Sequence, residues 1–72
     1  MGDRLIRVIR RGQGKGLRTV ASDTGIDLGT LSRFERGQRG LSEGNLVKLA
    51  HYYGLPIDTV LQRLPEPQEV PA

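Results

Sequence analysis

Residues 17–37 carry apolar positions at the spacing of two short helices that pack across each other: Val20, Ala21, Ile26, Leu31 and Phe34. Gly25 lies where the chain must leave the first helix, and glycine adopts the left-handed conformation of such an exit without strain. Asp27 can accept hydrogen bonds from the free N–H groups of a second helix, which begins near Leu28. Gly37 marks its end, after about Arg36. The pattern therefore predicts a helix, a tight turn and a second helix.

The N-terminal residues predict a helix from Asp3 to Arg11, with Asp3 as its cap. Its buried stripe consists of Leu5, Ile6, Val8 and Ile9. The glycine-rich residues 11–16 follow a helix rather than a strand, and they lack the Gly-Lys-Ser/Thr ending of a phosphate-binding loop. We therefore interpret them as a mobile connector to the helix at residues 17–24.

Two further helices are predicted after residue 41. The first follows Ser42, its cap, ends at Gly54 and has an apolar side made of Leu46, Val47, Leu49, Ala50 and Tyr53. The second starts at Pro56 or Ile57 and runs to about Leu64. This helix has more apolar residues than so short a helix needs to pack against the core. We therefore expect a second subunit to contact some of Ile57, Val60, Leu61 and Leu64.

The length and composition indicate one small globular domain. The chain has 72 residues, of which 36% are hydrophobic, and we assign the domain to residues 1–64 and a proline-rich disordered tail to residues 65–72. No apolar run approaches the roughly 20 residues of a membrane span, and the basic N-terminus lacks the apolar region of a signal peptide. We therefore expect a cytoplasmic protein without a membrane partner.

Candidate chemistry is sparse. The chain has no cysteine, and His51 has no second ligand at metal-binding spacing, so we interpret it as a surface or partly packed histidine. No pairing of a nucleophile with a base and no paired carboxylates are present in the sequence. An enzyme is therefore not supported, and no cofactor, metal or small-molecule ligand is expected.

The charge is concentrated in the predicted domain. Residues 1–64 hold all 11 lysines and arginines against six acids, a net charge of +5, and two glutamates in the tail lower the total to +3. Nine of the cations are arginine, whose planar side chain makes bidentate contacts with phosphate and guanine. A basic balance alone is weak support for a nucleic-acid partner.

The sequence around the predicted turn resembles the Cro and cI-type (Xre-like) helix-turn-helix family of phage and bacterial transcription regulators. Residues 21–26 read Ala-x-x-x-Gly-Ile, and residues 30–37 read Thr-Leu-Ser-Arg-Phe-Glu-Arg-Gly, close to the family's recognition-helix signature. The resemblance runs from about Ile6 to Leu61 without a gap. It implies an all-α, compact five-helix, lambda-repressor-like DNA-binding domain.

The resemblance also implies a function. We expect a sequence-specific DNA-binding transcriptional regulator, in the form of a small dimeric Cro-like repressor that binds a pseudo-palindromic operator on double-stranded DNA. The homodimer is expected to be weak away from DNA. The alternative is a protein-binding helical adaptor or antitoxin with the same fold, which would show an apolar patch on the helix at residues 28–36.

Matched to the family, four residues of the helix at residues 28–36 face the bases of the major groove: Leu28, Gly29, Ser32 and Arg33. Arg33 can bind guanine O6 and N7, or it can clamp a phosphate instead. Gly29 allows either a closer approach or a less direct readout. Phosphate contacts are expected from Leu17, Arg18, Arg36, Gln38 and Arg39, with Leu17 contributing only through the free N–H groups of its helix start.

The resemblance finally implies a bridge between Arg10 and Glu35, which would join the first helix to the end of the recognition helix. The alternative is that Arg10 is one more solvated cation beside Arg7 and Arg11. A half-buried glutamate close to phosphates would be costly without a partner, which favours the bridge.

Overall fold

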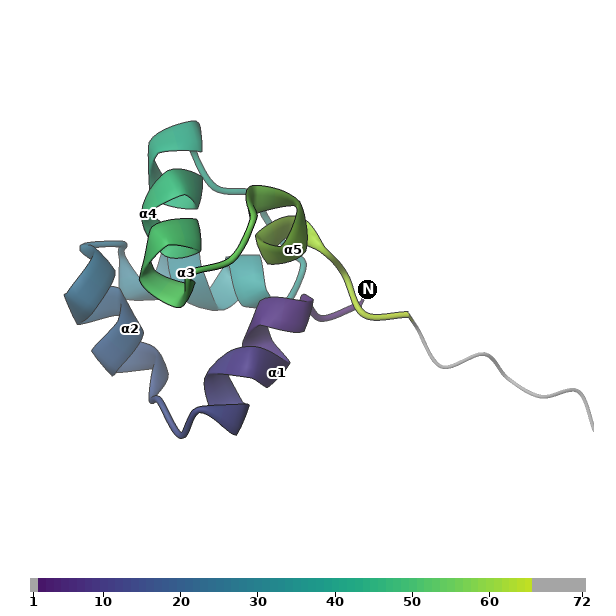
Figure 1. Cartoon of the computed structure of the whole chain (residues 1–72), viewed down its shortest axis with the longest axis horizontal. Helices are drawn as coiled ribbons and strands as arrows, with labels where there is room; N and C mark the ends of the chain where they lie inside the picture. The colour runs from purple at the N-terminus through teal and green to yellow at the C-terminus, as the bar shows by residue number, and fades with distance from the viewer. Residues whose placement is uncertain (1, 66–72) are drawn as a thin grey trace, which may run out of the picture.

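The computed structural model describes residues 2–65, and five helices make up the regular structure of that range. The predicted disordered tail therefore lies, from residue 66 onward, outside the described residues. In chain order the helices are α1 (Leu5–Gly12), α2 (Leu17–Thr24), α3 (Leu28–Glu35), α4 (Glu43–Tyr53) and α5 (Ile57–Leu61) (Figure 1). None of them is long and apolar enough to cross a membrane.

The helix ends in the middle of the chain follow the predicted local chemistry. The Asp27 carboxylate accepts a 3.0 Å hydrogen bond from the backbone N–H of Thr30, and the Ser42 hydroxyl accepts one of 3.3 Å from Asn45. Gly25 ends α2 in the left-handed region, with φ of +74°. The helix, tight turn and second helix predicted from the sequence are confirmed.

The start of α1 differs from the prediction. The helix begins at Leu5, and Asp3 does not cap it, because its carboxylate instead accepts a 2.6 Å hydrogen bond from Arg7. Val8 is also not buried, since 51% of its surface is exposed. The helix turns its Ile6 and Arg10 side to the core, and Val8 lies about 200° around the axis from Ile6.

The last helix is shorter than predicted and ends at Leu61 rather than Leu64. Residues 62–64 are extended and pair antiparallel with residues 3–5: Leu5 N–H donates to Gln62 at 2.9 Å and Leu64 N–H donates to Asp3 at 2.8 Å. Pro65 also disfavours a helical conformation at Leu64. The two segments therefore lie side by side, as Figure 1 shows for the purple residues before α1 and the yellow residues after α5.

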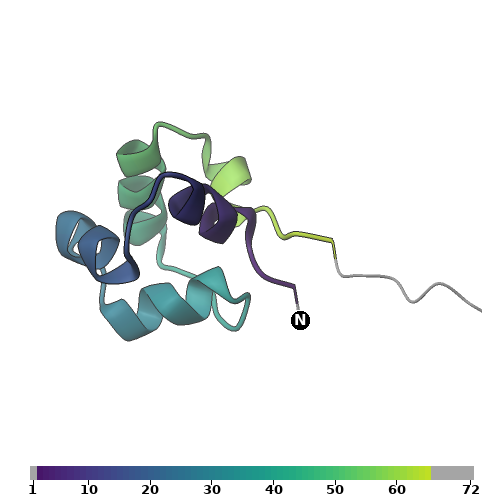
Figure 2. The ribbon, with the colours of Figure 1, turned by 90° about the horizontal axis from the view of Figure 1, so that it is seen from below.

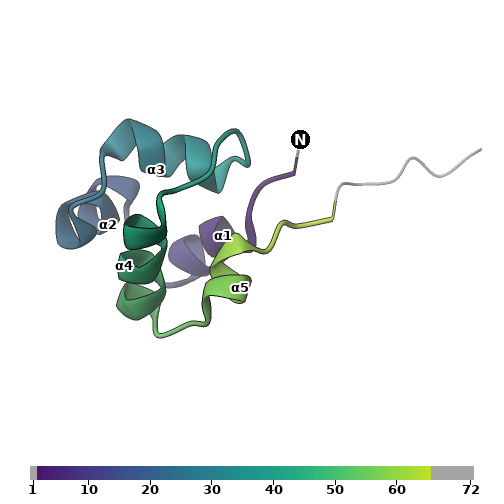
Figure 3. The ribbon, with the colours of Figure 1, turned by 90° about the horizontal axis from the view of Figure 1, so that it is seen from above.

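The core gathers one apolar face from every helix, and it consists of Ile6, Val20, Ala21, Ile26, Leu31, Phe34, Leu49, Ala50 and Val60. All five apolar residues predicted for the helix, turn and helix are among them. Val47, which the sequence places on the apolar side of α4, is 43% exposed, because it flanks the stripe that faces the core and lies on a groove beside α5. Figures 2 and 3 show α3 along one edge of the molecule, where its outer side is not covered by another helix.

Candidate nucleic-acid interface

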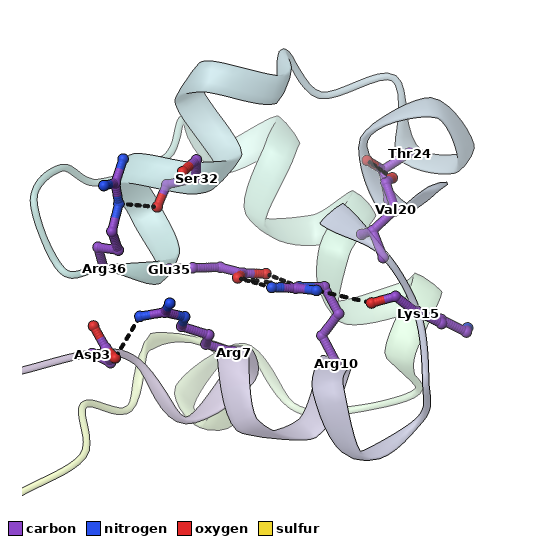
Figure 4. Close-up of polar contacts among 9 residues, drawn as sticks. All are labelled: Asp3, Arg7, Arg10, Lys15, Val20, Thr24, Ser32, Glu35 and Arg36. Atoms are coloured by element: carbon purple, nitrogen blue, oxygen red, sulfur yellow. Dashed lines mark hydrogen bonds and ion pairs between the residues drawn. The ribbon is translucent and has the colours of Figure 1, made fainter. Parts of the chain in front are cut away.

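The turn between α2 and α3 is held by backbone and side-chain contacts. The Thr24 hydroxyl donates a 2.7 Å hydrogen bond to the Val20 carbonyl (Figure 4). It also accepts a 3.3 Å bond from the Ile26 N–H. Ala21 is buried where α2 meets α3, and its small side chain allows the two helices to approach. These contacts fix the direction in which α3 leaves the turn.

The four residues expected to face bases lie together on the side of α3 away from the core. Residues 28, 29, 32 and 33 share one face at the helical period, while Leu31, Phe34 and Glu35 of the same helix are buried. Arg33 and Leu28 are exposed, and Ser32 and Gly29 are partly exposed. The face therefore offers one cation, one hydroxyl and one apolar side chain to a partner.

Further cationic and polar side chains are exposed on the neighbouring α2 and after the end of α3. Arg18 is exposed in the first turn of α2, and Arg36, Gln38 and Arg39 are exposed in the turn that follows α3. Leu17 differs from them, because its side chain packs against the core. It can offer only backbone, at a helix start where Gly16 supplies no side-chain cap.

Asp27 places a fixed negative charge at the start of the same face. Its carboxylate accepts hydrogen bonds from the backbone N–H and the hydroxyl of Thr30, and these bonds lower the pKa of Asp27. The positive charge of Arg33 lowers it further. Asp27 is therefore ionised at neutral pH and keeps a negative charge at the start of α3.

Arg10 and Glu35 form the ion pair that the resemblance implied. Arg10 Nε donates to Glu35 Oε2 at 2.8 Å and Nη2 donates to Oε1 at 3.0 Å, while Nη1 donates to the Lys15 carbonyl at 2.8 Å (Figure 4). Both side chains are buried, Glu35 with only 2% of its surface exposed. The hydrogen bonds to Glu35 raise the pKa of Arg10. The pair joins α1 to the last turn of α3, and it also fixes the connector at Lys15, which was predicted to be mobile.

Arg4 holds the same end of α3, and sequence reasoning missed it. Its Nε donates to the Phe34 carbonyl at 2.9 Å, its Nη1 donates to the Leu61 carbonyl at 2.7 Å, and its guanidinium lies 4.2 Å from the centre of the Phe34 ring. Burial lowers the pKa of Arg4, and the charge of Arg63 lowers it further. An arginine three positions from the chain start looks like any surface cation, so the sequence carried no signal for this contact.

The residues expected at a dimer contact divide into two groups. Ile57 and Leu61 are exposed and lie one turn apart on α5, and Leu64 is partly exposed. Val60 is fully buried in the core, so its assignment to a dimer contact is wrong. An open apolar groove between α4 and α5 continues this surface, with Val47 and Leu55 in its walls.

Among residues 2–65, no three or more histidine, aspartate or glutamate side chains come together as a metal site would require. His51 is exposed on α4.

Comparison with known proteins supports the interpretation of α2 and α3 as a helix-turn-helix. A family model described as a helix-turn-helix domain matches residues 4–64 of the 72 residues, a range that includes all five helices. Comparisons with curated proteins and with solved structures found no match. The five-helix, all-α arrangement of the described residues is that of a lambda-repressor-like domain. The chain therefore belongs to the helix-turn-helix domain family, with the features of its Cro/cI-type (Xre-like) members.

Proposed function

We propose that this protein is a sequence-specific DNA-binding transcriptional regulator that places α3 in the major groove. The observation that carries the proposal is the outer face of α3, which is free of the core and is accompanied by exposed Arg18 on the neighbouring α2 and by exposed Arg36 and Arg39 after the end of α3. A helix with this exposure can reach base edges while flanking cations bind phosphates on either side of the groove. Arg33, Ser32 and Leu28 are the side chains available for readout, with Gly29 between them.

The finer proposal is a small dimeric Cro-like repressor that acts in the cytoplasm without a cofactor. One recognition helix reads only about four base pairs, so selection of a site in a genome needs a second copy one helical turn away. Ile57 and Leu61 supply an exposed apolar contact for that copy on α5, and Leu64 lies next to them in the chain. So small a contact favours a dimer that forms on DNA rather than in free solution.

The groove between α4 and α5 also supports the alternative of a protein-binding adaptor or antitoxin, since its walls are apolar. The two functions differ in what α3 does. An adaptor that docks through the groove does not need cations around α3, whereas a DNA-binding protein loses affinity when they are removed.

Salt dependence tests the DNA-binding proposal. Operator DNA is first selected from a random pool, and its affinity is then measured across salt concentrations. A dimer brings six exposed cations to the DNA, three from each subunit. We therefore expect a roughly thousandfold loss of affinity between about 50 and 200 mM salt. Arg39→Ala should weaken all sequences equally and flatten the salt slope, while Arg11→Ala removes the same charge outside the proposed contacts. Affinity that does not change with salt would contradict the proposal.

Half-site DNA tests the dimer. We expect the wild-type protein to bind a two-fold site cooperatively, and Leu61→Asp to abolish this cooperativity while half-site binding persists. Val8→Asp, on the exposed side of α1, is the matched control. Equal affinity for one and two half-sites, with one copy bound to each, would rule out the cooperative dimer.

A further inference from the structure

Gly29 lies in the first turn of α3, where glycine has no evident conformational reason to be. Its φ is not positive, unlike that of Gly25 or Gly37, so any L-residue could adopt this backbone. Glycine inside a helix also costs about 1 kcal/mol relative to alanine. The side chains that surround Gly29 offer another explanation for a glycine at this position.

Two charged side chains converge on that space. A Cβ placed on Gly29 would lie 3.3 Å from Asp27 Oδ2, and 3.8 Å and 3.9 Å from the two terminal nitrogens of Arg33. The Arg33 guanidinium thus lies back along α3, over the glycine, and within the described residues no hydrogen bond or ion pair joins it to the nearby Asp27 carboxylate. A Cβ at position 29 would crowd Asp27 Oδ2 and would contact the Arg33 nitrogens at ordinary van der Waals distance.

Asp27 is well placed to orient the arginine. Thr30 restrains Oδ2 with two hydrogen bonds, of 3.0 Å from its N–H and 3.2 Å from its hydroxyl, so the position of the carboxylate does not depend on Arg33. A fixed anion restricts the conformations of a neighbouring guanidinium and removes part of the ordering cost of binding. It also opposes a phosphate at the same place, because phosphate and carboxylate repel each other.

We propose that Gly29 and Asp27 are specificity-determining positioning residues: with no side chain at position 29, the negative charge of Asp27 biases the nearby Arg33 toward a conformation that favours one guanine over a backbone phosphate. The inference rests on the proposed function and deepens it. It decides between the two roles that the sequence left open for Arg33, since a bidentate guanine contact depends on orientation whereas a phosphate clamp depends mainly on charge. It also assigns Gly29 a role that needs no contact between Gly29 and a base.

The test compares base preference at each operator position for four variants. Arg33→Ala identifies the position that Arg33 reads. Gly29→Ala should reduce the guanine preference at that same position about tenfold, with little change in affinity for unrelated DNA. Gly44→Ala is the control, because it makes the same change in the first turn of α4, where no atom lies within 4 Å of the new Cβ.

Asp27→Asn separates charge from space. Asparagine keeps the capping oxygen but loses the negative charge, so we expect tighter binding to all sequences together with a weaker guanine preference at the Arg33 position. The midpoint of thermal unfolding, measured for each variant, excludes a loss of fold as the cause. For Gly29→Ala the gain in helix propensity opposes the shift that the Cβ imposes on Asp27 Oδ2.

Two results would overturn the inference. An unchanged guanine preference in Gly29→Ala would show that the space over residue 29 does not matter. A uniform loss of affinity, or a changed preference at another position, would show that Gly29 itself approaches the DNA. Failure of the proposed function is distinguishable from both, because the wild-type protein would then select no operator at all.

Discussion

Removal of Arg10 should cost a large part of the stability of this domain. Both Glu35 carboxylate oxygens accept hydrogen bonds from Arg10, and within residues 2–65 no other side chain donates to them. Arg10→Met would leave a carboxylate with 2% exposure and no donor. Breaking a buried pair in this way costs about 3–5 kcal/mol. Since a domain of this size is stable by about 5 kcal/mol, we expect Arg10→Met to be largely unfolded at room temperature.

The double variant Arg10→Met/Glu35→Met makes the test specific. It removes the charge together with its partner, and apolar replacement of a buried ion pair is often neutral or stabilising. We therefore expect it to recover most of the lost stability, with a coupling free energy of about 3 kcal/mol in a double-mutant cycle. Urea unfolding followed by circular dichroism measures each variant.

A second arginine of α1 provides the control. Arg7 pairs with Asp3 at 2.6 Å, but both side chains are partly exposed. Exposed pairs contribute less than about 1 kcal/mol, so Arg7→Met should unfold near the wild-type urea midpoint. If Arg10→Met resembled Arg7→Met, or if the double variant were no more stable than the single one, the reasoning from burial would be refuted.

Two further predictions concern groups with unusual surroundings. The Tyr53 hydroxyl is buried without a hydrogen-bond partner among residues 2–65, and this burial raises the pKa of Tyr53 to about 12. In the unfolded chain the same hydroxyl ionises near pH 10, before it does so in the folded protein. Stability should therefore fall between about pH 10 and 12, and Tyr53→Phe, measured by urea unfolding across that range, should show a smaller fall and no loss at pH 7. Gly37 has φ of +74°, and a Cβ there would overlap the Gly2 carbonyl oxygen. Gly37→Ala should lower stability by at least about 1 kcal/mol in thermal unfolding, whereas Gly40→Ala, with open space around it, should not.

The helix, turn and helix could be predicted because their causes are local. The side chains of Asp27 and Ser42 cap helices that begin at the next residue, and Gly25 ends α2 within its own turn. The outward placement of residues 28, 29, 32 and 33 follows from the helical period alone. The family resemblance added the Arg10–Glu35 pair, which no local pattern contains.

The parts that were missed depend on tertiary contacts between distant residues. Val60 and Leu61 are adjacent apolar residues, and only the packing of α5 decides that the first is buried and the second exposed. Arg4 becomes an internal residue only because α3 and α5 both end beside it. The position of the Arg33 guanidinium over Gly29 depends on a side-chain rotamer, which periodicity does not specify.

The pairing of residues 3–5 with residues 62–64 has a consequence for the order of folding. The pairs α2–α3 and α4–α5 meet through contacts between neighbours in the chain, whereas this pairing must close a loop of almost the whole domain. Closure of so long a loop carries an entropic cost of roughly 4 kcal/mol, so we expect the two ends to join late in folding and to separate early in local opening. Each such opening withdraws Arg4 from the Phe34 carbonyl, and α3 then loses one of the two arginines that hold its C-terminal end.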